Sequence, residues 1–160
     1  MLCNKTEKWL YKLPENYIWQ SPYKQDKNWA FQDDHGITWL RLMQDGRVEI
    51  MKGYAWDGCT PKFCFLDILF GIPDGAVDSA TGRPKTYYAS LVHDALCQFQ
   101  PADLPLNRTQ VDKCFLLLMQ ETNFRLRYIY YAAARIFGWF TQPVTRKIRK
   151  VHGGRRIELT

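Results

Sequence analysis

The residues best suited to chemistry are a histidine and two aspartates in the second half of the chain. His93 and Asp94 are adjacent in the stretch TYYASLVHDALCQF, and Asp112 lies in RTQVDKCFLLLMQE. An imidazole held by a carboxylate can take a proton from water and act as a general base. We therefore expect Asp112 to hold His93 through one ring nitrogen and to leave the other free, which makes both residues candidate catalytic groups.

A bound hard cation is the second chemistry that the sequence suggests. Asp94 can supply carboxylate oxygens to calcium, and backbone carbonyls of the loop Gly53–Pro61, GYAWDGCTP, can complete the coordination shell. Within this loop the candidates are the carbonyls of Trp56 and Gly58, together with Asp57. The alternative for Asp57 is an ordinary turn former in an Asp-Gly step.

Helices must position these side chains. Apolar residues recur at helical spacing in Thr86–Phe99, in Arg108–Glu121 and in Phe124–Trp139. Asn107 is a plausible N-cap for the second helix, and Asn123 ends it. Adjacent residues point about 100° apart on a helix, so His93 and Asp94 must face different partners.

The first third of the chain favours strands instead. Ile37–Met43 and Arg47–Lys52 flank an Asp-Gly step, which is a strong signal for a β hairpin. Ser21–Asp34 is polar and is predicted to be a loop. The side chains expected to face inward are Ile37, Trp39, Leu42, Val48 and Ile50.

The order of these elements predicts an α+β fold. It has an N-terminal β hairpin or small antiparallel sheet, followed by three helices with a central antiparallel pair. The 160 residues suit one domain, which we place at residues 1–145. Residues 146–160 are basic and broken by Gly, and we expect a tail that is mobile or docked on a partner.

Composition indicates the cellular compartment and the charge of possible partners. The chain has five cysteines at irregular spacing and no CxxC pair, which argues against a zinc ribbon and favours reduced thiols. The N-terminus lacks the apolar run of a signal peptide, and no apolar run is long enough for a membrane span. We therefore expect a cytoplasmic protein. The net charge of +6 suits an anionic partner without selecting one.

The order of the motifs resembles a phage and bacterial family of unknown function, domain-of-unknown-function family thirteen-fifty-three. Its T-D-G-A-S-I-P motif corresponds to Trp56–Pro61, and its H-D-Y-L-Y motif corresponds to His93–Cys97. Its acidic helix corresponds to Asp112 with Phe115. The resemblance covers Val48–Glu121 and implies a phage protein that is cytoplasmic in a bacterial host or virion-associated.

A more distant resemblance is to bacterial and fungal phospholipase A2. That family has a calcium loop, a helix with H-D-x-x-Y and a helix with an R-x-x-x-D-x-x-F-like pattern, whose spacing Arg108, Asp112 and Phe115 reproduce. The resemblance implies His93 as general base, Asp112 as its orienting partner, Asp94 as a ligand of calcium, and a lipid or cell-envelope ester as substrate. Calcium would also stabilise the oxyanion.

Other interpretations stay open. The same residues can form a buried polar network in a non-enzymatic phage accessory or virion component that contacts other virion proteins. Cys97 stands where the lipase family has Tyr, and it or Cys59 is a candidate thiol nucleophile beside His93.

Two surface interpretations concern the last third of the chain. Trp139 and Phe140 lie near basic residues and can anchor at a lipid interface, the alternative being packing of a terminal helix. The basic residues of Arg135–Arg156 can bind nucleic acid, although no specific nucleic-acid motif is present.

Overall fold

The fold is α+β, as the sequence predicted. The computed structural model describes residues 11–56, 58, 63–65, 68–70, 77–136, 138 and 154–160, with only the backbone of 63–65 and 68–70. Its strands are β1 (Tyr11–Lys12), β2 (Tyr17–Gln20), β3 (Asn28–Gln32), β4 (Thr38–Leu42), β5 (Arg47–Ile50), β6 (Ala55–Trp56), β7 (Phe63–Phe65), β8 (Ile68–Phe70) and β9 (Arg155–Leu159). Its helices are α1 (Tyr87–Phe99), the 3-10 turn η1 (Gln100–Ala102), α2 (Arg108–Glu121) and a third helix over residues 127–136.

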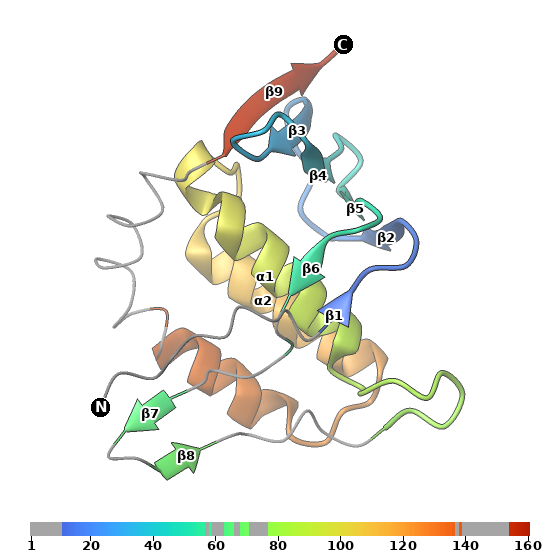
Figure 1. Ribbon diagram of the computed structural model, residues 1–160, viewed down its shortest axis with the longest axis vertical. Coiled ribbons are helices and arrows are strands. Elements are labelled where there is room, and N and C mark those ends of the chain that lie inside the picture. The colour runs from blue at the N-terminus through green and yellow to red at the C-terminus, as the bar shows by residue number, and fades with distance from the viewer. Residues whose placement is uncertain are drawn as a thin grey trace.

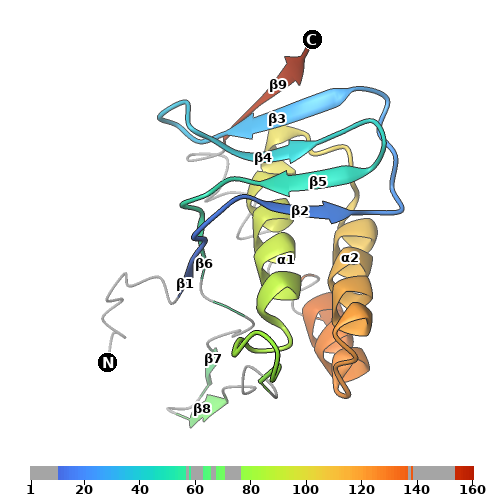
Figure 2. The same cartoon turned by 90° about the vertical axis from the view of Figure 1, so that its right-hand side faces the viewer.

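A five-stranded antiparallel sheet in the order β2-β5-β4-β3-β9 lies against the helices, and β1-β6 and β7-β8 are small separate pairs. Figure 2 shows its strands running across the end of the helix pair where α1 finishes and α2 begins. The sheet therefore covers only part of the helix pair.

The hairpin predicted around Asp45-Gly46 is present as β4 and β5, which pair from Leu40 with Ile50 to Leu42 with Val48. Gly46 adopts φ of 91°, which a side chain would disfavour. The inward-facing residues predicted for its first strand were partly wrong.

Leu40 and Leu42 are the buried side chains of β4, whereas Ile37 is 48% exposed and precedes the strand. Trp39 points to the other side of the sheet, where its Nε1 donates a hydrogen bond to Asp33 Oδ2 at 2.7 Å. Alternation along a strand turns every other side chain outward, so Leu40 and Trp39 cannot both face the core.

Two strands of the five-stranded sheet were not predicted, and neither were the short strands β6, β7 and β8. β3 lies inside Ser21–Asp34, which was expected to be a loop, and it buries Ala30 and Phe31. β9 lies inside the residues expected to form a basic tail, and it pairs with β3 along its full length. Polar and basic composition hid both strands, because a strand at or near a sheet edge needs few apolar residues.

The two central helices pack side by side as an antiparallel pair, as predicted (Figure 1). A capping box starts α2, because Asn107 accepts a hydrogen bond from the Gln110 backbone and Gln110 Oε1 accepts one from the Asn107 backbone. Asn123, at φ of 50°, follows the last turn. The predicted ends of both helices are thus confirmed within a residue.

The third helix begins at residue 127, three residues after the predicted start at Phe124. Residues 124–126 form a turn before it, and the helix runs back along α2, so that Arg135 reaches Thr109 near the start of α2. Trp139 and Phe140 lie outside the described residues.

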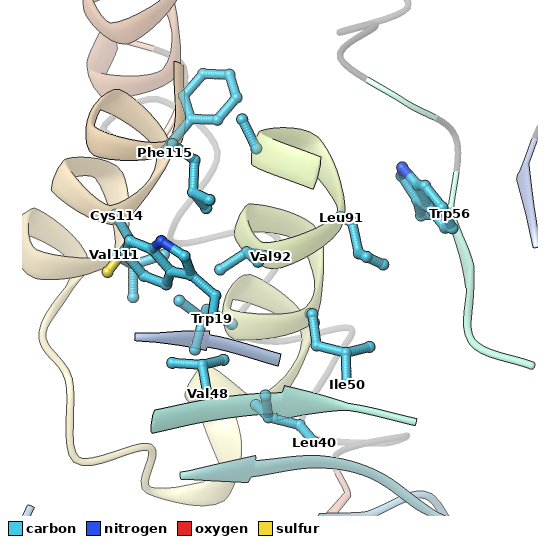
Figure 3. Close-up of a cluster of buried hydrophobic side chains, with 14 of the residues drawn as sticks. Trp19, Leu40, Val48, Ile50, Trp56, Leu91, Val92, Val111, Cys114 and Phe115 are labelled. Carbon is cyan, nitrogen blue, oxygen red and sulfur yellow. The ribbon is translucent and has the colours of Figure 1, made fainter. Parts of the chain in front are cut away.

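One apolar core joins sheet and helices. Figure 3 shows Val48 and Ile50 of the sheet facing Leu91 and Val92 of α1, with Val111 of α2 close by. These side chains are at most 1% exposed. Burial of this kind contributes roughly 1.5–3 kcal/mol for each large apolar side chain, so the core fixes where α1 and α2 stand.

No helix in the described part of the chain is both long and apolar enough to cross a membrane.

Candidate functional site

The structure brings His93 and Asp112 together. His93 Nε2 lies 2.8 Å from Asp112 Oδ1, which is a hydrogen bond between the middle of α1 and the first half of α2. The Asp112 side chain is 0% exposed, whereas that of His93 is 15% exposed. One edge of the imidazole therefore reaches solvent while its partner is sealed in the core.

Two arginines also hold Asp112. Arg108 Nε donates to Asp112 Oδ1 at 2.9 Å from one turn earlier on α2, and Arg135 Nη1 donates to Asp112 Oδ2 at 3.3 Å from the third helix. Both carboxylate oxygens thus have charged donors, which a buried carboxylate requires. The cluster of His93, Arg108, Asp112 and Arg135 is called the Asp112 network below.

The sequence reasoning missed the role of both arginines. Arg108 and Asp112 are four residues apart on a helix, a spacing at which opposite charges meet, so this contact had a signal. Arg135 comes from a separate helix, and no sequence pattern indicated its contact with Asp112. The Arg108 guanidinium also packs closely on Gly138, because a Cβ added there would lie 2.8 Å from the guanidinium carbon.

The surroundings of His93 favour its charged form. Burial opposes protonation, but the sulfur of Cys97 and the hydrogen bond to Asp112 outweigh it and raise the pKa of His93 to about 10. Burial likewise opposes ionisation of Asp112, and the contacts with His93 and Arg108 outweigh it, so that the pKa of Asp112 lies below its ordinary value. Both shifts act in the same direction, because each favours the charged form of its group.

The Cys97 sulfur lies beside the imidazole. Its Sγ is 3.7 Å from His93 Nε2 and 3.9 Å from His93 Nδ1, so it is almost equally far from the two nitrogens. On the opposite helix, the ring of Phe115 packs on the imidazole with centroids 4.9 Å apart. The thiol is therefore within hydrogen-bond range of both ring nitrogens. The thiol-nucleophile alternative for Cys97 stays a prediction, and Cys59 lies outside the described residues.

The predicted calcium residues are only partly described. Trp56 ends β6 with its indole buried, and its Nε1 donates to Ser90 Oγ at 3.1 Å. Ser90 lies one turn before Asp94 on the same side of α1, so the backbone after β6 starts beside that helix face. Gly58 adopts φ of 76°, and Asp57 lies outside the described residues.

Among the described residues no three His, Cys, Asp or Glu side chains come close enough to hold a metal ion. Because the predicted ligand Asp57 lies outside these residues, the calcium site at Asp94 stays a prediction.

Neither family models, nor curated proteins, nor solved structures give a match to this chain. The two resemblances therefore stay predictions that rest on their motif residues.

Proposed function

We propose that the chain is a phospholipase A2-like hydrolase that cleaves a lipid or cell-envelope ester, with His93 as general base and Asp112 as its orienting partner. The observation that carries this proposal is the 2.8 Å contact between His93 Nε2 and Asp112 Oδ1. It combines a sealed carboxylate with a partly exposed imidazole. In such a pair the carboxylate fixes the ring while the ring meets substrate and water.

The reaction uses the second ring nitrogen. Asp112 accepts the hydrogen of His93 Nε2, and His93 Nδ1 takes a proton from a water molecule whose oxygen attacks the ester carbonyl. The tetrahedral intermediate then loses the alcohol, which receives the proton from His93. One ester and one water give one acid and one alcohol, and the imidazole returns to its starting state.

Calcium assistance is part of the proposal. The candidate ligands are the Asp94 carboxylate, the backbone carbonyls of Trp56 and Gly58, and Asp57. A bound calcium ion would supply positive charge to the developing oxyanion. The packing of Trp56 on Ser90, one turn from Asp94, supports placing the loop there.

Hydrolysis of phosphatidylglycerol and of a soluble aryl ester, each with calcium and with a chelator, tests the proposal. We expect His93→Gln to lower kcat/KM by about 100-fold or more, since positioned general bases contribute at least that much. His35→Gln is the matched control, because His35 lies on an exposed turn. Equal activity of the His93 variant and the wild type would overturn the catalytic role of His93. Equal rates of hydrolysis with and without calcium would overturn the proposed role of calcium.

A second candidate function has its own supporting observation. Asp112 is fully buried and bonded to cationic groups from α1, α2 and the third helix, which is what a structural network in a non-enzymatic phage accessory or virion component requires. In that case His93→Gln lowers the unfolding temperature, and the wild type shows no hydrolysis of either substrate.

A further inference from the structure

The third helix leaves large apolar side chains in solvent. Leu126, Tyr128, Ile129 and Ile136 are 45%, 58%, 62% and 55% exposed, and they lie within eleven residues of the chain. Elsewhere in the described residues the exposed large apolar side chains are isolated, as Ile18 is on β2. A group of this kind is a mark of a contact surface.

Three exposed apolar residues share one face of the helix, and Leu126 lies in the turn that precedes it. Ile129, Ala132 and Ile136 are spaced at i, i+3 and i+7, and all three are exposed. The opposite face is packed, because Tyr130 is 3% exposed and meets the ring of Phe124 edge-on. We call Leu126, Ile129, Ala132 and Ile136 the outer stripe.

The helix cannot turn the outer stripe inward without breaking the Asp112 network. Arg135 Nη1 donates to Thr109 Oγ1 at 3.0 Å and to Asp112 Oδ2 at 3.3 Å. These hydrogen bonds hold the third helix against α2 at the residue before Ile136. The exposure of the stripe is thus imposed by contacts on the other side of the helix.

The charge of the neighbouring residues indicates what kind of partner the outer stripe meets. Residues 122–136, which form the third helix and the turn before it, contain three arginines and no Asp or Glu. Arg125 is exposed next to the stripe, and the guanidinium of Arg127 lies 5.0 Å from the centre of the exposed Tyr128 ring. Apolar residues with flanking arginines and a tyrosine are the composition of a helix that lies in a membrane interface.

We propose that the third helix lies in the headgroup region of an anionic phospholipid bilayer, with the outer stripe inserted among the acyl chains. A second copy of this chain is a poorer occupant, because the two faces would bring Arg125 and Arg127 against their own copies without an acidic partner. A nucleic acid is also poorer, because its phosphates would leave Ile129 and Ile136 uncovered. Membrane binding does not require the proposed hydrolase activity. Only the further step, in which binding delivers ester substrate to His93, rests on the proposed function.

The test is flotation of the full chain with vesicles of ether-linked phosphatidylglycerol, which has no ester to hydrolyse, and of ether-linked phosphatidylcholine. We expect binding to phosphatidylglycerol that weakens with added salt, and at least a tenfold weaker partition for the double variant Ile129→Ser/Ile136→Ser. The matched control is Ile18→Ser/Ile37→Ser, which removes two exposed side chains, 57% and 48% exposed, that belong to the five-stranded sheet region and not to the third helix. Its partition should equal that of the wild type.

Three outcomes would overturn the membrane proposal: no binding to phosphatidylglycerol vesicles, equal losses from both double variants, or a dimer by light scattering that Ile129→Ser/Ile136→Ser dissociates. The ether lipids make it possible to test membrane binding separately from the proposed hydrolase activity. Binding to ether vesicles without hydrolysis of ester phosphatidylglycerol removes only the hydrolase, and hydrolysis of the soluble ester without vesicle binding removes only the membrane surface.

Discussion

The charge of His93 is set by its neighbours. A general base must be neutral to accept a proton, and a pKa raised to about 10 leaves only a small neutral fraction at pH 7. We therefore expect kcat/KM for ester hydrolysis to rise from pH 7 and to level off above about pH 10.

The control for this pH profile is Asp112→Asn. Loss of the carboxylate removes a contact that raises the pKa of His93, so the midpoint of the profile should move to lower pH while its height falls. A profile for the wild type that is flat or that peaks near pH 7 would contradict the assignment of His93 as base.

The same pair makes folding stability depend on pH. The raised pKa of His93 means that its charge stabilises the fold fully below pH 6.5, and this contribution is lost as the pH rises through about 10. The lowered pKa of Asp112 means that its contribution is present above pH 3.8 and is lost as the pH falls further. The free energy of unfolding should therefore decline on both sides of this range.

Neutralising Asp112 should be costly for folding. Asp112→Asn leaves Arg108, Arg135 and His93 without a buried counter-charge, and breaking a buried ion pair in this way costs about 3–5 kcal/mol. Urea unfolding at pH 7 measures the loss. Asp103→Asn is the control, because Asp103 is exposed in a left-handed conformation that Asn tolerates, and it should change the free energy of unfolding little. Equal values for the two variants would show that the Asp112 network is not needed for stability.

At the scale of elements, the start of α2 decides where Arg108 and Asp112 stand. Asn107→Ala removes one half of the capping box, and we expect a loss of about 1 kcal/mol in the free energy of unfolding. Lys113→Ala, at an exposed position later in α2, should leave it unchanged. Thermal unfolding followed by circular dichroism compares the two, and a Lys113 effect as large as that of Asn107 would show that the cap has no special role.

Sequence reasoning worked where a local signal existed. The Asp45-Gly46 turn, the Asn107 cap and the helical spacing around His93 are each readable within one or two turns of chain, and they placed β4, β5, α1 and α2 correctly. The contact of His93 with Asp112 followed from the two helices being antiparallel neighbours. Arg135 could not be found this way, because it reaches Asp112 from 23 residues away.

At the scale of the whole molecule, the non-local strand β9 was the main feature beyond prediction. It pairs with β3 although Lys27 and Glu158, which form an ion pair across the two strands, are 131 residues apart. A short strand with three charged residues gives little periodic signal in the sequence. Such a strand pairs with its neighbour only when the edge of the sheet has already formed.

The start of β9 is also packed on the core. A Cβ added at Gly154 would lie 2.2 Å from the Gln32 carbonyl oxygen and 2.7 Å from Phe99 Cε1. We expect Gly154→Ala to lower the free energy of unfolding by about 1–3 kcal/mol, because an overpacked site must shift backbone or ring.

A double-mutant cycle checks the cause of this loss. Phe99→Leu should reduce the penalty of Gly154→Ala, since the smaller side chain makes room, and denaturant unfolding of the two single variants and the double variant measures the coupling. Gly36→Ala is the comparison, because no atom lies within 4 Å of its Cβ position and only its φ of 79° opposes a side chain. Strictly additive losses for Phe99 and Gly154 would show that the penalty comes from the Gln32 carbonyl oxygen and not from the Phe99 ring.

The pairing of β9 with β3 also has a consequence for synthesis on the ribosome. β3 emerges more than a hundred residues before β9, and at 5–20 residues per second its outer edge waits roughly 6–25 s for its neighbour. During that interval the backbone groups of β3 that later bind β9 are open to strands of other nascent chains. Slower translation after β3 should therefore increase the aggregated share of newly made protein.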